Sequence, residues 1–342
     1  MRAARLLAGF DRLTIEDLPR PVPKGRQVLV KVAGAGVCRS DLHVIDGEFD
    51  HLVRRPVTAG HEISGWVVEH GPDADSPPMG TSVSVMVGWG CGDCHWCLHG
   101  HEQLCPSGRE AGSTADGGFA EYVLVPDGRF LVPLGALDPI IATPLGCAAL
   151  SAFAGVRRVL PYLREGGALV IIGCGGLGQF AIHYAARLSS AAIIAADPRP
   201  QARLQALKLG AHHALDTGPQ TDLEVADLCG PLGARAVIDF VGSNQSLALA
   251  ATITGPRGCI ALMGLAGGVI EVGFESLAPE ASLTTVVAGT IADLHEVVQL
   301  AQSGLPEIPI TTYPLERIGE AISDLRAGLI EGRAVIVPGG QT

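Results

Sequence analysis

Four cysteines with the spacing C-x2-C-x2-C-x7-C lie within fifteen residues: Cys91, Cys94, Cys97 and Cys105. Four thiolates at this spacing are typical of a closed tetrahedral zinc site. A thioredoxin-like redox pair would instead need a single C-x-x-C beside a βαβ unit. An iron–sulfur cluster is the minor alternative, because Pro106 follows the last cysteine as it does in ferredoxins. Since four thiolates fill the shell of a zinc ion and leave no position for a substrate, we expect this metal to be structural.

A second group of residues could perform different chemistry. Cys38, His61 and Cys147 together would make a Cys2His set with one open position, which is the pattern of a catalytic zinc site. Spacing alone cannot link residues that lie so far apart in the chain. Each also has an ordinary explanation, because a buried cysteine is usually inert and a single histidine is usually hydrogen-bonded or at the surface. At this point the set is only a hypothesis.

Residues 173–178, Gly-Cys-Gly-Gly-Leu-Gly, follow a predicted strand and open a predicted helix. In this setting the pattern G-x-G-x-x-G indicates a dinucleotide site, whose glycines allow a tight turn, close approach of a pyrophosphate and helix–strand packing. Asp197 follows at the distance expected for a carboxylate that accepts hydrogen bonds from ribose hydroxyls. That carboxylate repels a 2′-phosphate and favours NAD over NADP, a preference that Arg199 weakens slightly. A glycine-rich turn without a ligand is the alternative.

The elements around these residues fall into two patterns. The first ~150 residues carry short β-branched runs separated by Gly, Pro and Asp, which predicts an irregular all-β barrel or sandwich. From residue 167 onward, apolar strands alternate with helices, which predicts a doubly wound parallel sheet. The expected strands of this sheet are 167–173, 191–197, 212–216, 236–242, 259–264 and 284–290. The tail, with a helix over 293–303 and a strand over 334–338, could rejoin the first domain.

Length and charge restrict the class of protein. A chain of 342 residues favours two domains. With 24 Lys and Arg against 35 Asp and Glu, the formal net charge is −11, which argues against nucleic-acid binding. No apolar stretch is long enough for a membrane span, and the N-terminal segment turns acidic too soon for a signal peptide. We therefore expect no membrane partner and a cytoplasmic protein, in which disulfides are rare.

Several motifs together resemble the zinc-dependent medium-chain alcohol dehydrogenases. They are CRSDLH (38–43), AGHEISGWVVEHG (59–71), the four-cysteine loop, DGGFAEY (116–122), GCGGLG with Asp197, and EGRAVIVPG (331–339). They occur in the order of that family and span almost the whole chain. The resemblance implies an α/β plus β fold: a GroES-like β-barrel catalytic domain over 1–150 plus 290–342, and a Rossmann NAD-binding domain over 151–289.

The resemblance also implies roles for single residues. Two zinc ions per chain are expected, a catalytic one on Cys38, His61 and Cys147 and a structural one on the four-cysteine loop. Asp41 is expected to orient the ligand histidine, Glu62 to lie behind the metal, and Ser40 and His43 to relay the substrate proton. The expected coenzyme contacts are Arg39, Gly173, Gly175, Gly176, Leu177, Gly178, Asp197, Val241 and Arg333.

The function implied is reversible hydride transfer between a primary or secondary alcohol and NAD, giving an aldehyde or ketone. A homo-oligomer is expected, a tetramer rather than a dimer. A polyol or sugar dehydrogenase of the same fold is the first alternative. Cys147 argues mildly against it, because such enzymes usually place a glutamate at the third or the adjoining ligand position. A zinc-free quinone oxidoreductase would lack these cysteines. A zinc-stabilised nucleotide-binding interaction protein without turnover is opposed by the charge and by Asp197.

Overall fold

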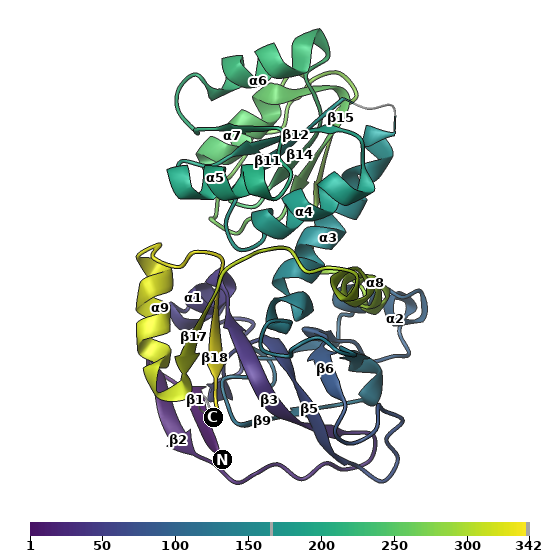
Figure 1. Cartoon of the computed structure of the whole chain (residues 1–342), viewed down its shortest axis with the longest axis vertical. Coiled ribbons are helices and arrows are strands. Elements are labelled where there is room, and N and C mark those ends of the chain that lie inside the picture. Colours follow the sequence, from purple (N-terminus) through teal and green to yellow (C-terminus); the bar gives the residue numbers. More distant parts are fainter. Residues whose placement is uncertain (165–166, 340–342) are drawn as a thin grey trace. The chain divides into compact units, whose positions relative to one another are not determined.

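The structure is a computed structural model that describes residues 1–164 and 167–339 (Figure 1). The chain divides into two compact units. Unit 1 comprises Met1–Leu150 and Ala288–Thr342, and unit 2 comprises Ser151–Val287. The first and last parts of the sequence therefore share one unit, and the middle part forms the other.

Unit 1 is built on β-sheets. Over its described residues, the main sheet has the strand order β10-β6-β5-β3-β18-β17, and β9 also pairs with β3. These strands are β3 (Val28–Val37), β5 (Glu62–His70), β6 (Ser82–Val85), β9 (Tyr122–Val125), β10 (Leu131–Pro133), β17 (Ile310–Pro314) and β18 (Arg333–Val337). The smaller sheets consist of β1 (Arg2–Leu6), β2 (Leu13–Asp17) and β4 (Val57–Thr58), and of β7 (Gly88–Trp89) and β8 (Arg109–Glu110).

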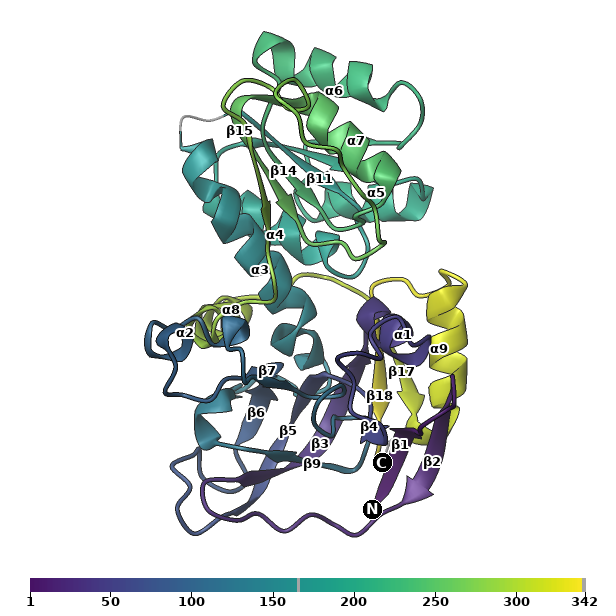
Figure 2. The same cartoon turned by 180° about the vertical axis from the view of Figure 1, so that it is seen from behind.

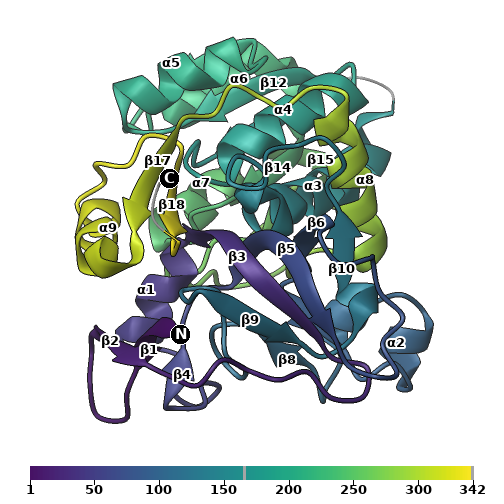
Figure 3. The same cartoon turned by 60° about the horizontal axis from the view of Figure 1, so that its bottom comes forward.

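The tail rejoins the first domain through a strand pair. Strand β18 runs antiparallel to β3, with Ala334 opposite Val37 and Ile336 opposite Ala35, and Figures 1 and 3 show the two strands side by side. Nine of the ten residues of β3 are buried, as expected for a central strand covered on both faces. The C-terminal segment therefore completes the sheet that carries the end of β3, immediately before Cys38.

Short helices surround the sheets of unit 1. They are α1 (Arg39–Ile45), α2 (His95–Leu98), α8 (Ile291–Gln302) and α9 (Ile318–Arg326), and α3 (Ala148–Val159) begins at its boundary. Helix α8 starts at a capping box in which Thr290 and Asp293 bond each other's backbone N–H groups. The four-residue helix α2 lies inside the four-cysteine loop (Figure 2). No helix of the described residues combines the length and the apolar character that crossing a membrane requires.

Unit 2 contains a parallel sheet of six strands within the described part of the chain, in the order β13-β12-β11-β14-β15-β16. The strands are β11 (Ala168–Ile172), β12 (Ala192–Ala196), β13 (His213–Leu215), β14 (Ala234–Asp239), β15 (Thr254–Leu262) and β16 (Ser282–Thr285). In chain order this is 3-2-1-4-5-6, the Rossmann topology. The prediction of a doubly wound sheet is confirmed, and the carboxyl ends of the first two strands lead to Gly173 and Asp197.

Helices cover both faces of this sheet (Figures 1 and 2). Helices α4 (Gly178–Leu188) and α5 (Pro200–Lys208) pack on β11, β12 and β13, whereas α6 (Thr221–Cys229) and α7 (Asn244–Ile253) pack on β14 and β15. The sixth strand is earlier and shorter than the predicted 284–290. Pairing with β15 ends at Leu262 opposite Thr285, and Ala288 already belongs to unit 1. The apolar residues after Thr285 had suggested a longer strand.

Candidate functional site

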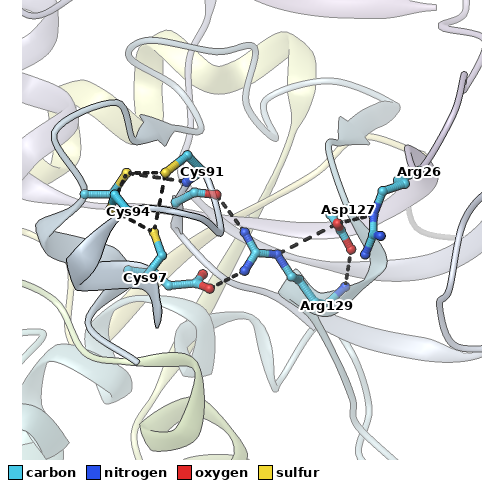
Figure 4. Close-up of polar contacts among 9 residues, drawn as sticks. Arg26, Cys91, Cys94, Cys97, Asp127 and Arg129 are labelled. Atoms are coloured by element: carbon cyan, nitrogen blue, oxygen red, sulfur yellow. Dashed lines mark hydrogen bonds and ion pairs between the residues drawn. The ribbon is translucent and has the colours of Figure 1, made fainter. Parts of the chain in front are cut away.

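The sulfur atoms of the four-cysteine loop lie within one small sphere (Figure 4). Cys91 and Cys105 are 3.5 Å apart at Sγ, Cys94 and Cys97 3.6 Å, Cys94 and Cys105 3.8 Å, and Cys91 and Cys97 3.9 Å. Four sulfurs bound to one tetrahedral zinc at about 2.3 Å would be about 3.8 Å from one another. The observed set fits one ion. A cluster of several irons would hold its cysteine sulfurs further apart, because the irons lie between them.

One thiol of this loop, that of Cys94, is also chemically suited to a metal, whereas the pKa values of the Cys91 and Cys97 thiols are raised. A hydrogen bond from the backbone of Cys97 lowers the pKa of Cys94 to about 7, so a thiolate is available at neutral pH. A Cβ on Gly90 would lie only 2.6 Å from Cys97 Sγ, so the chain leaves room for the sulfur there. The prediction of a four-thiolate zinc site is therefore supported mainly by the positions of the four sulfur atoms.

An ion-pair network connects this loop to the main sheet (Figure 4). Arg129 pairs with the carboxylate of Glu102, which lies between Cys97 and Cys105 in the sequence, and its Nη2 donates to the Gly90 carbonyl at 2.7 Å. Asp127 bonds the backbone N–H of Arg129 and the guanidinium of Arg26. Sequence reasoning missed this network, because nothing in the spacing of these residues relates them to the loop.

The second predicted group is also assembled. The ligand atoms of Cys38, His61 and Cys147 lie within 4.8 Å of one another, and all three residues are buried. Cys38 caps the N-terminus of α1, His61 precedes β5, and Cys147 follows the 3-10 turn Thr143–Gly146. A hydrogen bond from Cys147 holds the pKa of the Cys38 thiol well below its ordinary value, helped by His61 and against the effect of burial. Two thiols and one imidazole at this distance suit zinc with an open position.

Asp41 fixes the orientation of His61. Its Oδ1 lies 3.0 Å from His61 Nδ1, and its Oδ2 accepts from the Cys38 backbone N–H at 2.8 Å. With Nδ1–H donated to the carboxylate, the lone pair of Nε2 faces the two cysteine sulfurs. Ser40 lies on the same side, with Oγ 3.4 Å from His61 Nε2. One buried carboxylate therefore orients two members of the ligand group at once.

Glu62 is fully buried and held by Arg333. The guanidinium donates to the Glu62 carboxylate at 2.6 Å and 3.3 Å, and the Ala148 backbone N–H donates to it at 3.2 Å. A Cβ on Gly36 would lie 2.0 Å from Glu62 Oε1, so the glycine makes room for the carboxylate. Arg333 is itself almost wholly buried. The coenzyme contact expected for it stays a prediction, and the ion pair with Glu62 is a contact that the sequence did not indicate.

His43 is paired with a residue that the sequence analysis did not single out. Its Nδ1 lies 2.7 Å from Glu48 Oε2, and its ring contacts the ring of Phe49 with centroids 5.5 Å apart. The turn after α1 closes on this pair, since the Glu48 N–H donates to the His43 carbonyl. Arg39 is exposed at the first position of α1. The roles expected for both residues stay predictions.

In unit 2, the glycine-rich turn has the shape that a dinucleotide site needs. Gly173 has φ +88°, and a Cβ there would lie 2.8 Å from Val241 Cγ2. A Cβ on Gly178 would lie 2.0 Å from the Gly173 carbonyl oxygen, so only glycine allows α4 to start so close to the turn. Gly175 faces open space apart from the guanidinium of Arg199, and Gly176 and Leu177 complete the turn, with Leu177 as the N-cap of α4. The free N–H groups of this helix end could receive a phosphate.

Asp197 already has several hydrogen-bond donors. It accepts from the Cys174 backbone N–H at 2.8 Å and from the backbone, Nε and Nη2 of Arg199 at 2.9 to 3.0 Å. Burial raises the pKa of Asp197, but the hydrogen bonds from Arg199 lower it by more. The pKa of this carboxyl group therefore lies below its ordinary value. Arg199 therefore influences the coenzyme site more than the sequence suggested, because a ribose that reached Asp197 would compete with it.

Comparison with known proteins agrees with the folds of both units. Residues 24–136 match the alcohol dehydrogenase GroES-like domain, and residues 176–303 match the zinc-binding dehydrogenase family. The chain is 36% identical to an NAD-dependent alcohol dehydrogenase of Sulfurisphaera tokodaii over 99% of this chain and 100% of that one. It is 34% identical to a D-arabinose 1-dehydrogenase (NADP(+)) of Saccharolobus solfataricus over 98% and 97% of the two chains.

A similar solved structure extends the match to three dimensions. The crystal structure of the alcohol dehydrogenase from the hyperthermophilic archaeon Aeropyrum pernix has a TM-score of 0.92 at 30% identity, and covers 99% of this chain and 100% of that one. The GroES-like fold of unit 1 and the Rossmann fold of unit 2 are both part of this likeness. The chain therefore belongs to the zinc-containing medium-chain alcohol dehydrogenase family.

Proposed function

We propose that this protein is an NAD-dependent alcohol dehydrogenase that interconverts primary or secondary alcohols with aldehydes or ketones. The observation that carries the proposal is the buried group of Cys38, His61 and Cys147, whose ligand atoms lie within 4.8 Å of one another. Three protein ligands leave one coordination position for a substrate, whereas the four-cysteine loop leaves none. The first group is therefore assigned the catalytic zinc and the loop the structural zinc.

Zinc, NAD and the protein side chains would have separate roles in the reaction. Zinc supplies Lewis-acid polarisation of the substrate oxygen, and NAD supplies the hydride acceptor. Asp41 holds the tautomer of His61 that presents Nε2 to the metal position. The Glu62–Arg333 pair keeps a buried carboxylate behind the ligands, neutralised by a guanidinium. The glycine turn and Asp197 would hold the coenzyme pyrophosphate and ribose.

The protein must also move one proton during alcohol oxidation. Ser40 Oγ lies 3.4 Å from His61 Nε2, so a hydroxyl group stands beside a nitrogen that would hold the metal. We assign to Ser40 the acceptance of the substrate proton and to His43 its delivery to solvent. Glu48 binds Nδ1 of His43, which leaves Nε2 as the nitrogen that exchanges protons.

An assay over several alcohols tests the activity and the coenzyme preference together. We expect the wild type to reduce NAD with primary or secondary alcohols and to contain two zinc ions per chain. Asp197→Ala should lower kcat/KM for NAD by about tenfold or more and raise that for NADP, because the carboxylate favours ribose hydroxyls and repels a 2′-phosphate. No turnover of any alcohol, or a wild-type preference for NADP, would contradict the proposal.

A polyol or sugar dehydrogenase is the second candidate. One full-length relative at 34% identity carries the name of a D-arabinose 1-dehydrogenase. Cys147 as the third ligand still favours the first candidate. The same assay separates the two when it includes sugars and polyols beside simple alcohols.

We also propose that the protein is a homo-oligomer, a tetramer rather than a dimer. In the described structure β16 pairs only with β15 and leaves one backbone edge unpaired. The neighbouring segment exposes Val269, Val272 and Phe274, of which Phe274 is fully exposed. We expect light scattering to give a mass of several chains for the wild type and a smaller mass for Phe274→Asp. A monomeric wild type would contradict this proposal.

The cytoplasmic location is proposed on chemical grounds. The four-cysteine loop holds free thiols at metal-ligand distances, and such a group persists in a reducing compartment.

A further inference from the structure

Asp197 follows β12 directly, and the backbone around it fixes its position. The residue is almost wholly buried, and its own N–H donates to the Leu215 carbonyl of β13 at 3.1 Å. Arg203 of α5 donates to the carbonyls of Asp197 and Pro198 at 2.8 and 2.9 Å. None of these contacts involves the carboxylate, so the place of the residue does not depend on the partners of its side chain.

The carboxylate of Asp197 is saturated by donors from the described part of the chain. An ionised carboxylate offers about four acceptor positions, two on each oxygen. Oδ1 accepts from the backbone N–H and Nε of Arg199 at 2.9 and 3.0 Å. Oδ2 accepts from Arg199 Nη2 and from the Cys174 backbone N–H at 2.9 and 2.8 Å. Each oxygen therefore has one backbone donor and one guanidinium donor, and the fork of Arg199 covers both oxygens at once.

The two kinds of donor differ in how easily they can leave. The backbone N–H groups of Cys174 and Arg199 belong to the glycine turn and to the N-cap of α5, so they stay in place. The Arg199 side chain is 49% exposed. The turn beside it leaves space, since a Cβ on Gly175 would meet only Arg199 Nη2, at 3.4 Å, within 4 Å. The guanidinium can therefore rotate into water without a change in the backbone.

The positions that the guanidinium covers are those that a ribose needs. The adenosine ribose of a coenzyme carries two hydroxyl donors, at its 2′ and 3′ carbons, and departure of the guanidinium opens one acceptor position on each oxygen of Asp197. Ribose and guanidinium cannot occupy these positions together, because the backbone donors keep the other two. Binding then exchanges one set of hydrogen bonds for another, which gains less free energy than binding to an open carboxylate.

We propose that Arg199 is an internal competitor of the coenzyme: its guanidinium occupies the ribose-binding positions of Asp197 in the free protein, leaves them when the adenosine ribose binds, and thereby weakens coenzyme affinity. This inference rests on the proposed function, because it takes the glycine turn and Asp197 as the coenzyme site. It assigns Arg199 a role that opposes binding, whereas a cation close to a bound phosphate ordinarily favours binding. The sign of the effect therefore distinguishes the two roles.

A matched pair of probes tests the inference by calorimetry. ADP and 2′,3′-dideoxy-ADP differ only in the two ribose hydroxyls. In Arg199→Ala we expect the Kd for ADP to fall by about fivefold or more, and the Kd for the dideoxy probe to stay the same or to rise. Arg199→Lys keeps the positive charge but can cover only one oxygen, so it should also bind ADP more tightly than the wild type. Arg187→Ala, which changes an exposed arginine in the last turn of α4, is the control and should leave both Kd values unchanged.

A double-mutant comparison removes the carboxylate for which the two groups compete. In the Asp197→Ala background, Arg199→Ala should no longer strengthen ADP binding. Unchanged or weaker ADP binding in Arg199→Ala would overturn the inference, because the guanidinium would then be neutral or would assist the coenzyme. An equal gain for both probes, a gain that persists without Asp197, or no ADP binding by any variant would overturn it as well.

These measurements need no turnover, so they separate the inference from the proposed function. A wild type that binds ADP but oxidises no alcohol contradicts the proposed function, while the Kd values still decide the role of Arg199.

Discussion

Cys38→Ser is expected to lower kcat/KM for alcohol oxidation by roughly a thousandfold or more, while the melting temperature stays close to that of the wild type. A serine hydroxyl stays protonated near neutral pH and is a poor zinc ligand, so His61 and Cys147 alone would have to hold the ion. Cys38 lies at the start of the short helix α1 and is close in size to serine, so the fold should tolerate the change. Steady-state kinetics, zinc analysis and thermal unfolding measure the three quantities.

The control for this variant is Cys229→Ser. Cys229 is the last residue of α6 in unit 2 and belongs to neither group of possible metal ligands. It should retain wild-type activity and two zinc ions per chain, whereas Cys38→Ser should retain about one. Near wild-type activity in Cys38→Ser would show that these three residues do not hold the catalytic metal.

Cys94→Ser is expected to act on stability instead. Loss of one of four thiolates should release the structural zinc and destabilise the protein by more than about 4 kcal/mol, as losses of metal sites do. The loop 91–105 contains only the four-residue helix α2 and a 3-10 turn, so the metal is its main internal constraint. Thermal unfolding should show a clearly lower melting temperature, and zinc analysis should show about one ion per chain.

Catalytic activity distinguishes Cys94→Ser from Cys38→Ser. The molecules of Cys94→Ser that stay folded at low temperature should still oxidise alcohols, because Cys38, His61 and Cys147 are unchanged. A variant with a normal melting temperature and no activity would contradict the structural assignment of the loop. Arg129→Ala tests the same region more mildly, because it removes the ion pair with Glu102 and leaves all four sulfurs. It should lower the melting temperature less than Cys94→Ser does.

Features encoded over short distances could be predicted from the sequence. The four-cysteine loop has all its ligands within fifteen residues, so their spacing alone predicts that the four sulfur atoms lie close together. The glycine turn is similar, because its positive φ and the contact between Gly178 and Gly173 arise within one strand–turn–helix unit. The six parallel strands followed from the alternation of apolar runs and helices, although the last strand ended earlier than predicted.

Side-chain partners were harder to predict even when they were near in sequence. Arg199 was expected only to weaken the NAD preference slightly, yet it engages Asp197 through its backbone and its guanidinium. Glu48, five residues after His43, binds its Nδ1. Both pairs depend on rotamers and on the path of a turn, and residue type alone does not specify these.

By itself, the sequence determined the two local chemistries of this protein, a loop that saturates one metal ion and a turn that can receive a dinucleotide. The resemblance predicted that Cys38, His61 and Cys147 share a metal, but only the tertiary structure brought their ligand atoms together. It alone also showed that Arg333 reaches Glu62 across 271 residues and that Gly112 lies against Gly60. The physical reason is that these contacts are made by strand pairing and by backbone packed against glycine. Such contacts join parts of the chain whose separation carries no periodic signal, so spacing and composition alone do not reveal them.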